Sequence, residues 1–205
     1  MTTRYQHLTY SHAAQILARG TAADVGAPPT DDGPQELSDR ELRMLTEAFQ
    51  FQMATVTPQG WPYLQYRSGP PGFVHHLGGN TVAFADLTGN RQYVSVGNLS
   101  EDPRVALFVA DYPRRRRLKV FGRAVVVEPD ADPELFEWLH TVRDGRLSTR
   151  AERSIVIEVE AFDWNCSRAL VPQYTAEQVR ERVQPYIDEI TSLQQQIDEL
   201  KAQLP

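Results

Sequence analysis

Six segments in the middle of the chain are rich in β-branched and aromatic residues, and they constrain the fold more than any other feature. Such segments favour strands, and the two longest, Arg116–Glu128 and Ser154–Phe162, are dominated by valine and isoleucine. The other four segments are Phe51–Thr57, Trp61–Ser68, Thr81–Ala85 and Arg104–Ala110. Their hairpin-like spacing, interrupted by one helix, predicts a small six-stranded barrel rather than a parallel α/β sheet. The expected fold class is mainly β with flanking helices (α+β).

Helices are expected on both sides of this β-rich region. Ser38–Glu41 matches a capping box, in which the serine hydroxyl caps a helix start and the glutamate reaches back. Ser11–Arg19 is a candidate helix closed by Gly20, and Thr21–Gln35 is expected to be a loop because it is rich in proline and glycine. A further helix is expected over Ala131–Arg143.

The C-terminal segment carries a heptad pattern. Thr175–Gln178 is a second capping box, and the apolar residues beyond it alternate in steps of three and four. These residues are Val183, Tyr186, Ile190, Leu193, Ile197, Leu200 and Leu204. Such a seam predicts a partner helix, on the same domain or in another subunit, and Pro185 is expected to kink or restart the helix. The chain is therefore divided into an N-terminal helix and linker (1–37), a barrel (38–174) and a helical tail (175–205).

Composition and charge argue against several classes of protein. The 205 residues suffice for one domain with appendages, and the net charge of −6 argues against a general nucleic-acid binder. No apolar run approaches the length of a membrane span, and Met1–His7 has no apolar signal core, so we expect a cytoplasmic protein. Cys166 is the only cysteine, which excludes an internal disulfide and a multi-cysteine metal site.

Two further clusters have ordinary explanations. His75 and His76 are adjacent on an expected strand and would face opposite sides, so we expect no metal site there. The basic run Arg114–Arg117 is expected at a hairpin tip, either solvated or with one member in contact with a cofactor or substrate.

The segment Phe84–Tyr93 has the features of an anion-binding site. A strand ends in a turn, and Asn90–Leu99 has the composition of a helix, whose free N–H groups would favour negative charge. Arg91 adds a planar donor fork suited to a phosphate, and Arg67 supplies a second one from a strand end. A phosphate pocket is the leading hypothesis. In the alternatives, Arg67 pairs with an acidic residue and Asn90 is a helix cap.

Five blocks of the sequence resemble the pyridoxamine 5′-phosphate oxidase superfamily of FMN-binding split barrels. The blocks are Met53–Tyr63, Gln65–Arg67, Phe84–Gln92, Asn98–Phe108 and Leu118–Ala124. Their order and spacing match across about residues 38–170, and the chain is most similar to uncharacterised bacterial flavoproteins that also carry a segment like Asp163–Cys166 and a helical tail. The resemblance implies a six-stranded antiparallel split β-barrel that binds FMN.

The resemblance also implies a set of cofactor-binding residues. They are Arg67, Ser68, Phe84, Ala85, Asp86, Asn90, Arg91, Gln92, Arg117 and Trp164. Arg67 would contact the FMN phosphate or ribityl chain, and the segment at Asp86 would lie beside the flavin. Gln92 departs from the family pattern, which has a lysine there. Arg117 and Trp164 match positions that come from the second subunit in relatives, so FMN would lie at the interface of a homodimer.

The residues that hold the vitamin phosphate in the oxidases of this family are not matched. In the family's oxidases a lysine shortly after the strand arginine helps to hold the vitamin phosphate, but Ser68–Phe73 contains no lysine. A motif with arginine and histidine follows the tryptophan in those oxidases, and Asn165–Val171 does not match it. The family's tyrosine, arginine and serine set also has no clear counterpart in Leu139–Ser148. We therefore expect little or no oxidation of pyridoxamine or pyridoxine phosphate.

The sequence thus predicts an FMN-dependent oxidoreductase that acts on a small molecule through the isoalloxazine ring. It identifies no catalytic side chain, and it predicts no nucleic-acid or membrane partner. One alternative is a non-catalytic flavin-, deazaflavin- or haem-binding protein on the same barrel. A phosphate-dependent coiled-coil adaptor is the third possibility, and it would require an empty barrel.

Overall fold

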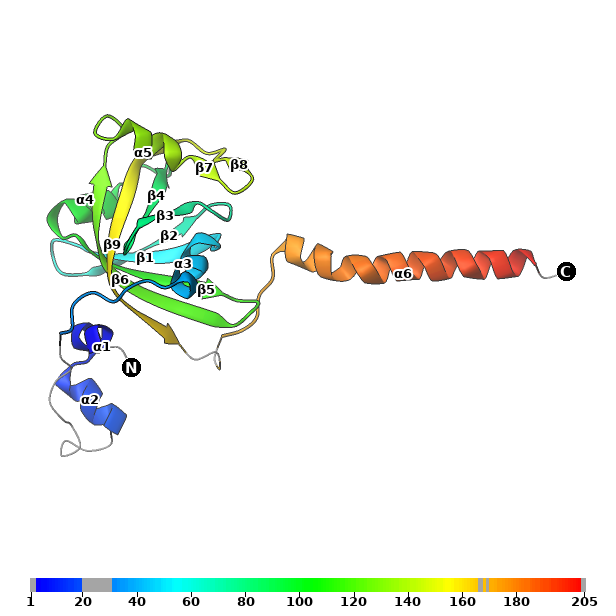
Figure 1. Cartoon of the computed structure of the whole chain (residues 1–205), viewed down its shortest axis with the longest axis horizontal. Helices are drawn as coiled ribbons and strands as arrows, with labels where there is room; N and C mark the ends of the chain where they lie inside the picture. The colour runs from blue at the N-terminus through cyan, green and yellow to red at the C-terminus, as the bar shows by residue number, and fades with distance from the viewer. Residues whose placement is uncertain (1–2, 20–30, 166–167, 169, 204–205) are drawn as a thin grey trace.

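A computed structural model describes residues 3–19, 31–165, 168 and 170–203 of the chain (Figure 1). It shows one curled antiparallel sheet with helices around it and a long C-terminal helix that projects away. The sequence features at Gly20, Cys166 and Leu204, and residues 21–30 of the expected loop, lie outside the described residues.

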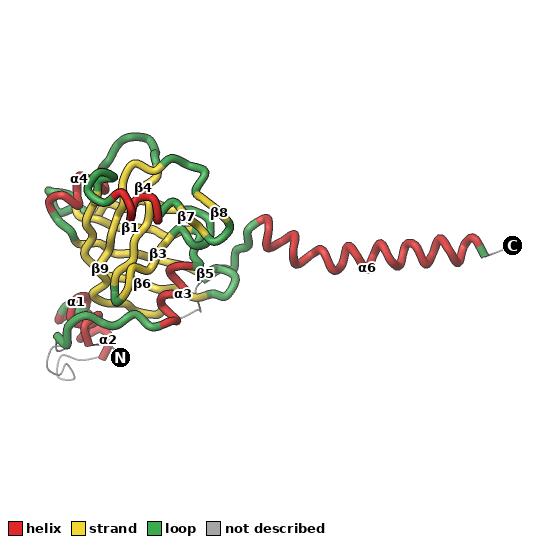
Figure 2. Tube along the Cα trace, turned by 45° about the horizontal axis from the view of Figure 1, so that its top comes forward, coloured by secondary structure: helices red, strands yellow, loops and turns green. Residues whose placement is uncertain are grey.

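The main sheet has the strand order β2-β1-β5-β6-β9-β4-β3, with every neighbouring pair antiparallel. Its strands are β1 (Gln50–Val56), β2 (Pro62–Ser68), β3 (Val74–Gly78), β4 (Thr81–Leu87), β5 (Arg104–Asp111), β6 (Arg116–Val127) and β9 (Ala151–Asn165). Strands β2 and β4 lie far apart in this order, yet Arg67 of β2 and Asp86 of β4 form an ion pair of 2.7 Å. The sheet is therefore rolled into a barrel, as the yellow strands of Figure 2 show.

All six predicted strands are present, and the predicted fold class is confirmed. The sequence reasoning missed β3, a short strand with two histidines and none of the β-branched run that marked the others. It also missed a small hairpin of β7 (Thr141–Val142) and β8 (Gly145–Arg146).

That hairpin corrects the helix predicted over Ala131–Arg143. Helix α5 covers only Pro133–Trp138, with Asp132 as its N-cap, whose side chain accepts a hydrogen bond from the Leu135 N–H at 2.9 Å. The chain then turns at Gly145, whose φ of 138° lies where glycine is favoured over other residues. The two β-branched residues of β7 therefore pair with β8 instead of extending the helix.

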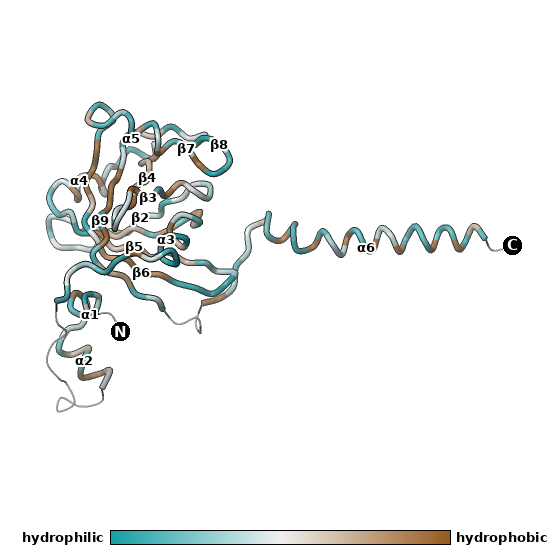
Figure 3. Tube along the Cα trace, in the orientation of Figure 1, coloured by the Kyte–Doolittle hydropathy of each residue, from teal (hydrophilic) through white to brown (hydrophobic). Residues whose placement is uncertain are grey.

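The barrel is filled by the inward faces of β1, β5, β6 and β9 together with β4. Met53, Val109, Leu118, Ile155 and Ile157 are fully buried in this core. At roughly 1.5–3 kcal/mol for each buried aliphatic side chain, these inward rows supply most of the favourable free energy of the barrel. Figure 3 shows that hydrophobic residues, drawn in brown, recur along the strands of the barrel.

Three further helices surround the barrel near the chain termini and between strands. They are α1 (Thr3–Thr9), α2 (His12–Arg19) and α4 (Val94–Glu101), of which α1 was not predicted. Helix α3 (Asp39–Thr46) begins with the predicted capping box at Ser38 and buries Leu45 against the barrel.

Helix α6 (Ala176–Ala202) starts at the predicted capping box and runs without interruption through Pro185. Of the kink or restart predicted at this proline, the restart is therefore wrong. The proline costs one backbone hydrogen bond but does not break the helix. Figure 1 shows α6 extending away from the barrel, and its apolar side chains from Val183 to Leu200 are exposed. Packing of the seam on its own barrel, one of the two alternatives, is not observed.

Among the described residues, none of the helices is both long and apolar enough to cross a membrane. The same residues contain no group of three or more histidine, cysteine, aspartate or glutamate side chains arranged to hold a metal ion.

Candidate functional site

A cavity of about 230 Å³ lies where the loop between β4 and α4 meets β2. We call it the α4 cavity. It is lined by Tyr63, Gln65, Arg67, Asp86, Leu87, Gly89, Asn90, Arg91, Gln92, Tyr93, Val94, Ser95, Val96 and Glu152. The structure thus brings together five of the predicted site residues, Arg67, Asp86, Asn90, Arg91 and Gln92.

Arg67 is anchored by an acidic residue, as one alternative from the sequence proposed. Its Nη1 donates to Asp86 Oδ1 at 2.7 Å, and the two side chains are only 16% and 8% exposed. The guanidinium has five N–H donors, and its Nε is buried without a hydrogen-bond partner in the described structure. Asp86 therefore orients Arg67 without saturating it.

Arg153 of β9 holds the other oxygen of the same carboxylate. Its Nη1 lies 3.5 Å from Asp86 Oδ2, and its Nε donates to Glu128 at 3.2 Å. The guanidinium also lies 5.1 Å from the centre of the Tyr93 ring. Two arginines therefore compensate the charge of Asp86, so that this carboxylate does not make the cavity repel an anion.

The predicted helix start at Asn90 is wrong by four residues, because α4 begins at Val94. Asn90 is not a helix cap, since its Oδ1 accepts a hydrogen bond from the Gln92 N–H at 3.3 Å and so forms a local turn. The true N-cap residue is Tyr93, which makes no side-chain cap bond. The first N–H groups of α4 are therefore not satisfied by a capping side chain and border the cavity.

The loop before α4 has an unusual backbone. Arg91 and Tyr93 have φ angles of 61° and 53°, in the left-handed region that non-glycine residues seldom adopt. Conformations of this kind cluster at ligand-binding segments, where the surrounding structure enforces them. The Arg91 side chain is exposed and forms no ion pair or hydrogen bond with any described residue.

Three predicted residues present no side chain to the α4 cavity. Phe84 is 2% exposed and packs edge-on against Phe51 in the core, with ring centres 5.2 Å apart. Ala85 is buried in a smaller apolar cluster beside Leu139, and Ser68 is exposed at the end of β2. Only the backbone of Phe84 and Ala85 could therefore contact a cofactor bound there.

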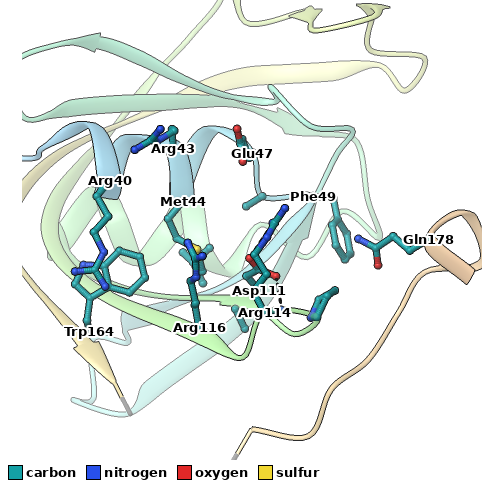
Figure 4. Close-up of a pocket in the computed structure, with 14 residues that line it drawn as sticks. Arg40, Arg43, Met44, Glu47, Phe49, Asp111, Arg114, Arg116, Trp164 and Gln178 are labelled. Carbon is teal, nitrogen blue, oxygen red and sulfur yellow. Dashed lines mark hydrogen bonds and ion pairs between the residues drawn. The ribbon is translucent and has the colours of Figure 1, made fainter. Parts of the chain in front are cut away.

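The remaining two predicted residues, Arg117 and Trp164, lie elsewhere in the protomer. Arg117 is on β6 opposite Asn165 of β9, and Trp164 pairs with Leu118. Trp164 lines a second cavity of about 450 Å³, which we call the α3 cavity (Figure 4). No residue lines both cavities, so within one protomer the ten predicted residues do not form a single site.

Trp164 is held by residues of α3. Its Nε1 donates to Glu41 Oε1 at 2.5 Å, and the Arg40 guanidinium lies 4.0 Å from the ring centre. Burial raises the pKa of Glu41, but hydrogen bonds from Ser38 and Trp164 outweigh it, and the pKa lies below its usual value. Glu41 is therefore a buried carboxylate that stays ionised and fixes the indole.

Sequence reasoning missed several residues of the α4 cavity. Tyr63 and Gln65 share one face of β2 with Arg67, so the period of two along a strand could have identified them. Arg153 could not have been found in this way. It meets Asp86 only because β4 pairs with β9 in a register that sets these two residues opposite each other.

Residues 38–166 match the family described as pyridoxamine 5′-phosphate oxidase, which is more than half of the chain. The chain belongs to this family. The match begins at the capping box of α3 and ends beside Trp164, so it spans all seven strands of the main sheet and every lining residue of the α4 cavity.

Solved structures with a similar fold include tagged HupZ from Group A Streptococcus, at 16% identity and a TM-score of 0.49. That similarity covers 67% of this chain and 100% of the other. An F420 reductase is 27% identical with a TM-score of 0.43, covering 58% of this chain and 93% of the other. An FMN-binding protein from Syntrophomonas wolfei is 14% identical with a TM-score of 0.45, covering 62% and 88%. None of the curated protein sequences compared with the chain matches it significantly.

Proposed function

We propose that this protein binds FMN with its phosphate in the α4 cavity and acts as an FMN-dependent oxidoreductase on a small molecule. The observation that carries the proposal is the arrangement of Arg67 and Arg91 beside the uncapped start of α4, in a member of the pyridoxamine 5′-phosphate oxidase family. Guanidinium forks and free helix N–H groups are the donors that phosphate prefers.

The residues of the cavity fit a phosphate better than a whole flavin. Arg67 has an unused buried donor, and Arg91 is free of partners among the described residues. A cavity of about 230 Å³ is smaller than the roughly 300–1,000 Å³ of sites that enclose a whole small molecule. The cavity would therefore hold the phosphate end, and the ring would need another surface.

A second subunit is the surface we propose for the ring, which makes the functional unit a homodimer. Trp61, Leu64 and Tyr66 are 73%, 64% and 51% exposed on and beside edge strand β2, and Leu64 and Tyr66 alternate along it with the residues that line the cavity. An apolar patch of this kind is typical of a protein–protein contact. Arg117 and Trp164, which the α4 cavity of the same protomer does not include, would then come from the partner.

The bound flavin would supply the hydride or electron transfer. The side chains of this chain would orient it: Arg67 is fixed by Asp86, and Asp86 is fixed in turn by Arg153. This chain of contacts positions a cofactor and leaves the redox chemistry to the flavin itself. We also propose a cytoplasmic location for this protein.

A non-catalytic carrier of a flavin, a deazaflavin or haem on the same barrel is the second candidate. It is favoured by the absence of lysine from Ser68–Phe73, where oxidases of the family hold their substrate. Identifying the ligand released from the purified protein distinguishes FMN from a deazaflavin or haem, and only turnover of a substrate distinguishes an FMN enzyme from an FMN carrier.

The purified protein is expected to show flavin absorption bands and to release FMN on denaturation. Chromatography of the released compound against FMN, riboflavin, F420 and haem standards identifies it. A protein that is colourless as purified and does not take up added FMN would contradict the proposal.

A further inference from the structure

We propose that α6 forms a parallel two-stranded coiled coil with α6 of a second copy, and that this coil clamps together the two protomers that share a flavin site. The pairing follows from the helix itself, and only the clamping role rests on the proposed function. The apolar stripe that the protomer leaves uncovered thereby gains one partner and one direction.

Helix α6 exposes an apolar stripe along most of its length. The helix has 27 residues and is therefore about 40 Å long. Figure 1 shows it projecting away from the barrel. A continuous stripe of this kind is typical of a coiled-coil seam, because it costs free energy to leave it in water. Its side chains recur in steps of three and four and are 43% to 67% exposed: Val183, Tyr186, Ile190, Leu193, Ile197 and Leu200.

The residues of the stripe select the same helix of a second copy. Val183, Ile190 and Ile197 occupy the first core position of the heptad. Leu193 and Leu200 occupy the second. β-Branched residues at the first position with leucine at the second favour two strands that run in parallel. An identical helix in the same register then places equal residues against each other in every layer of the seam.

The charges that flank the seam also fit the parallel direction. In a parallel pair, Glu189 lies beside Gln194 of the other helix. Gln196 likewise lies beside Lys201, and no like charges meet along the seam. An antiparallel pair of the full helices would instead place Arg180 beside Lys201 at each end. Repulsion between these like charges disfavours the antiparallel arrangement and so helps to set the direction.

The base of α6 lies beside the surface that carries Trp164. Gln178, in the first turn of the helix, lines the α3 cavity together with Trp164 (Figure 4). Trp164 is a residue that we propose to reach the flavin of the other protomer. Two parallel helices that start side by side bring the Trp164 surfaces of both barrels near each other, and two identical chains in a closed dimer share one two-fold axis. We therefore expect the coil and the shared flavin sites to join the same two protomers.

Disulfide trapping in the full-length protein tests the pairing. Cys166→Ser removes the only native cysteine, and L200C in the seam or Q195C on the outer face then supplies a single new one. Parallel helices in register bring the two copies of residue 200 within disulfide range, whereas Cα atoms on the outer faces lie beyond the limit of about 7 Å. We expect L200C to form the inter-chain disulfide at least about tenfold faster than Q195C, in a species with the mass of two chains by light scattering.

The alternatives give different results in the same experiment. In an antiparallel pair, Leu200 would lie opposite Val183 and about 25 Å from its own copy. A disulfide in a mixture of L200C and V183C, but not in L200C alone, would therefore overturn the parallel direction. Equal rates in L200C and Q195C, or no disulfide in any variant, would overturn the pairing. A mass of four chains would show that the coil joins protomers of different barrel pairs.

Dilution of the FMN-loaded protein tests the clamping role. L193D places a charge in the seam, and Q195D places the same charge on the outer face. Because the coil holds the two barrels at a high effective concentration, we expect L193D to release FMN at a protein concentration at least about tenfold higher than Q195D does. Equal release would overturn the clamping role.

Failure of the proposed function is distinguishable from failure of this inference. A protein that binds no flavin would contradict the proposed function, but disulfide trapping needs no flavin and would still decide the pairing. Light scattering during dilution compares the dissociation of L193D and Q195D dimers without flavin, and equal dissociation would overturn the clamping role.

Discussion

At the scale of single residues, the α4 cavity depends on how one carboxylate organises two arginines. Asp86 accepts from Arg67 at 2.7 Å and lies 3.5 Å from Arg153, so it fixes the guanidinium that we expect to meet the phosphate. Arg91 contributes differently, because it is exposed and takes no part in this network. Removing Arg91 therefore tests the phosphate contact without leaving a buried carboxylate unpaired.

Arg91→Ala is expected to weaken binding of FMN by roughly tenfold to a hundredfold and binding of riboflavin very little. The reason is that a charged hydrogen bond to the phosphate, worth about 1.5–3 kcal/mol, is available only to FMN. Fluorescence titration of the apoprotein with both ligands measures the difference. Arg104→Ala serves as the control, and equal weakening toward FMN and riboflavin in R91A would show that Arg91 does not hold the phosphate.

Glu41 gives a prediction about pH. Its pKa is lowered in the folded protein, so its ionised form stabilises the fold above the unfolded value of 4.5, and this contribution is lost as pH falls through the folded value. We expect Glu41→Gln to lower the free energy of unfolding by about 1–3 kcal/mol at pH 7 and by less at pH 3 to 4. Urea unfolding at both pH values measures this, with exposed Glu199→Gln as the control. A loss of stability that is the same at both pH values would contradict the role of the ionised carboxylate.

At the scale of elements, the two longest strands determine how the sheet closes. Strands β6 and β9 pair along most of their length, with a register shift between Phe121 and Gly122. A Cβ atom at Gly122 would lie 2.4 Å from the Glu158 carbonyl oxygen and 3.0 Å from Ile157 Cγ2. Glycine is required at this irregularity because the two backbones approach too closely for any side chain.

Gly122→Ala is therefore expected to destabilise the fold by about 1–3 kcal/mol, since backbone rather than a flexible side chain must move. The matched control is Gly97→Ala in α4, where a Cβ meets nothing within 4 Å. That control should be neutral or stabilising by up to about 1 kcal/mol, because alanine favours a helix. Thermal unfolding of both variants gives the comparison, and equal melting temperatures would contradict this account of Gly122.

Helix α6 matters for the whole molecule, because none of the described residues of its own protomer covers its apolar seam. Val183, Ile190 and Ile197 occupy one core position of the heptad, and Leu193 and Leu200 the other. β-Branched residues at the first position with leucine at the second favour a parallel two-stranded coiled coil. We therefore expect α6 to pair with the same helix of a second copy, in addition to the barrel contact.

Truncation after Tyr174 is expected to leave a dimer that still binds FMN but unfolds at a lower temperature. Three heptads are marginal as an isolated coiled coil, so the barrel surfaces should hold the dimer together by themselves. Light scattering and flavin absorbance report the two properties, with L193D as a point variant and Q195D on the outer face as its control. A truncated monomer saturated with FMN would rule out a cofactor site at the subunit interface.

Turnover is also a property of the assembled molecule. With no lysine in Ser68–Phe73, we expect oxidation of pyridoxamine or pyridoxine phosphate well below ordinary enzyme rates of about 1 per second. A steady-state assay with both vitamers and oxygen measures this. Turnover at or above that rate would mean that other basic residues, such as Arg143 or Arg146, replace the missing lysine.

The sequence alone determined the parts of this protein that depend on local chemistry. β-Branched runs marked six strands, and the capping boxes at Ser38 and Thr175 marked two helix starts, because strand preference and capping act over a few residues. The heptad seam and the candidate phosphate ligands Arg67 and Arg91 were visible for the same reason. The start of α4 was misplaced because the Asn90 side chain forms a turn that competes with the helix.

Only the tertiary structure decided which of these residues meet. Asp86 and Arg153 are 67 positions apart and come together through the register of β4 and β9, which local sequence does not encode. The same holds for the α3 cavity, where arginines of a helix and of a hairpin gather around Trp164 at the end of β9. Strand register and the rolling of the sheet depend on burying all the inward rows at once, so contacts between distant residues emerge only when the whole barrel has formed.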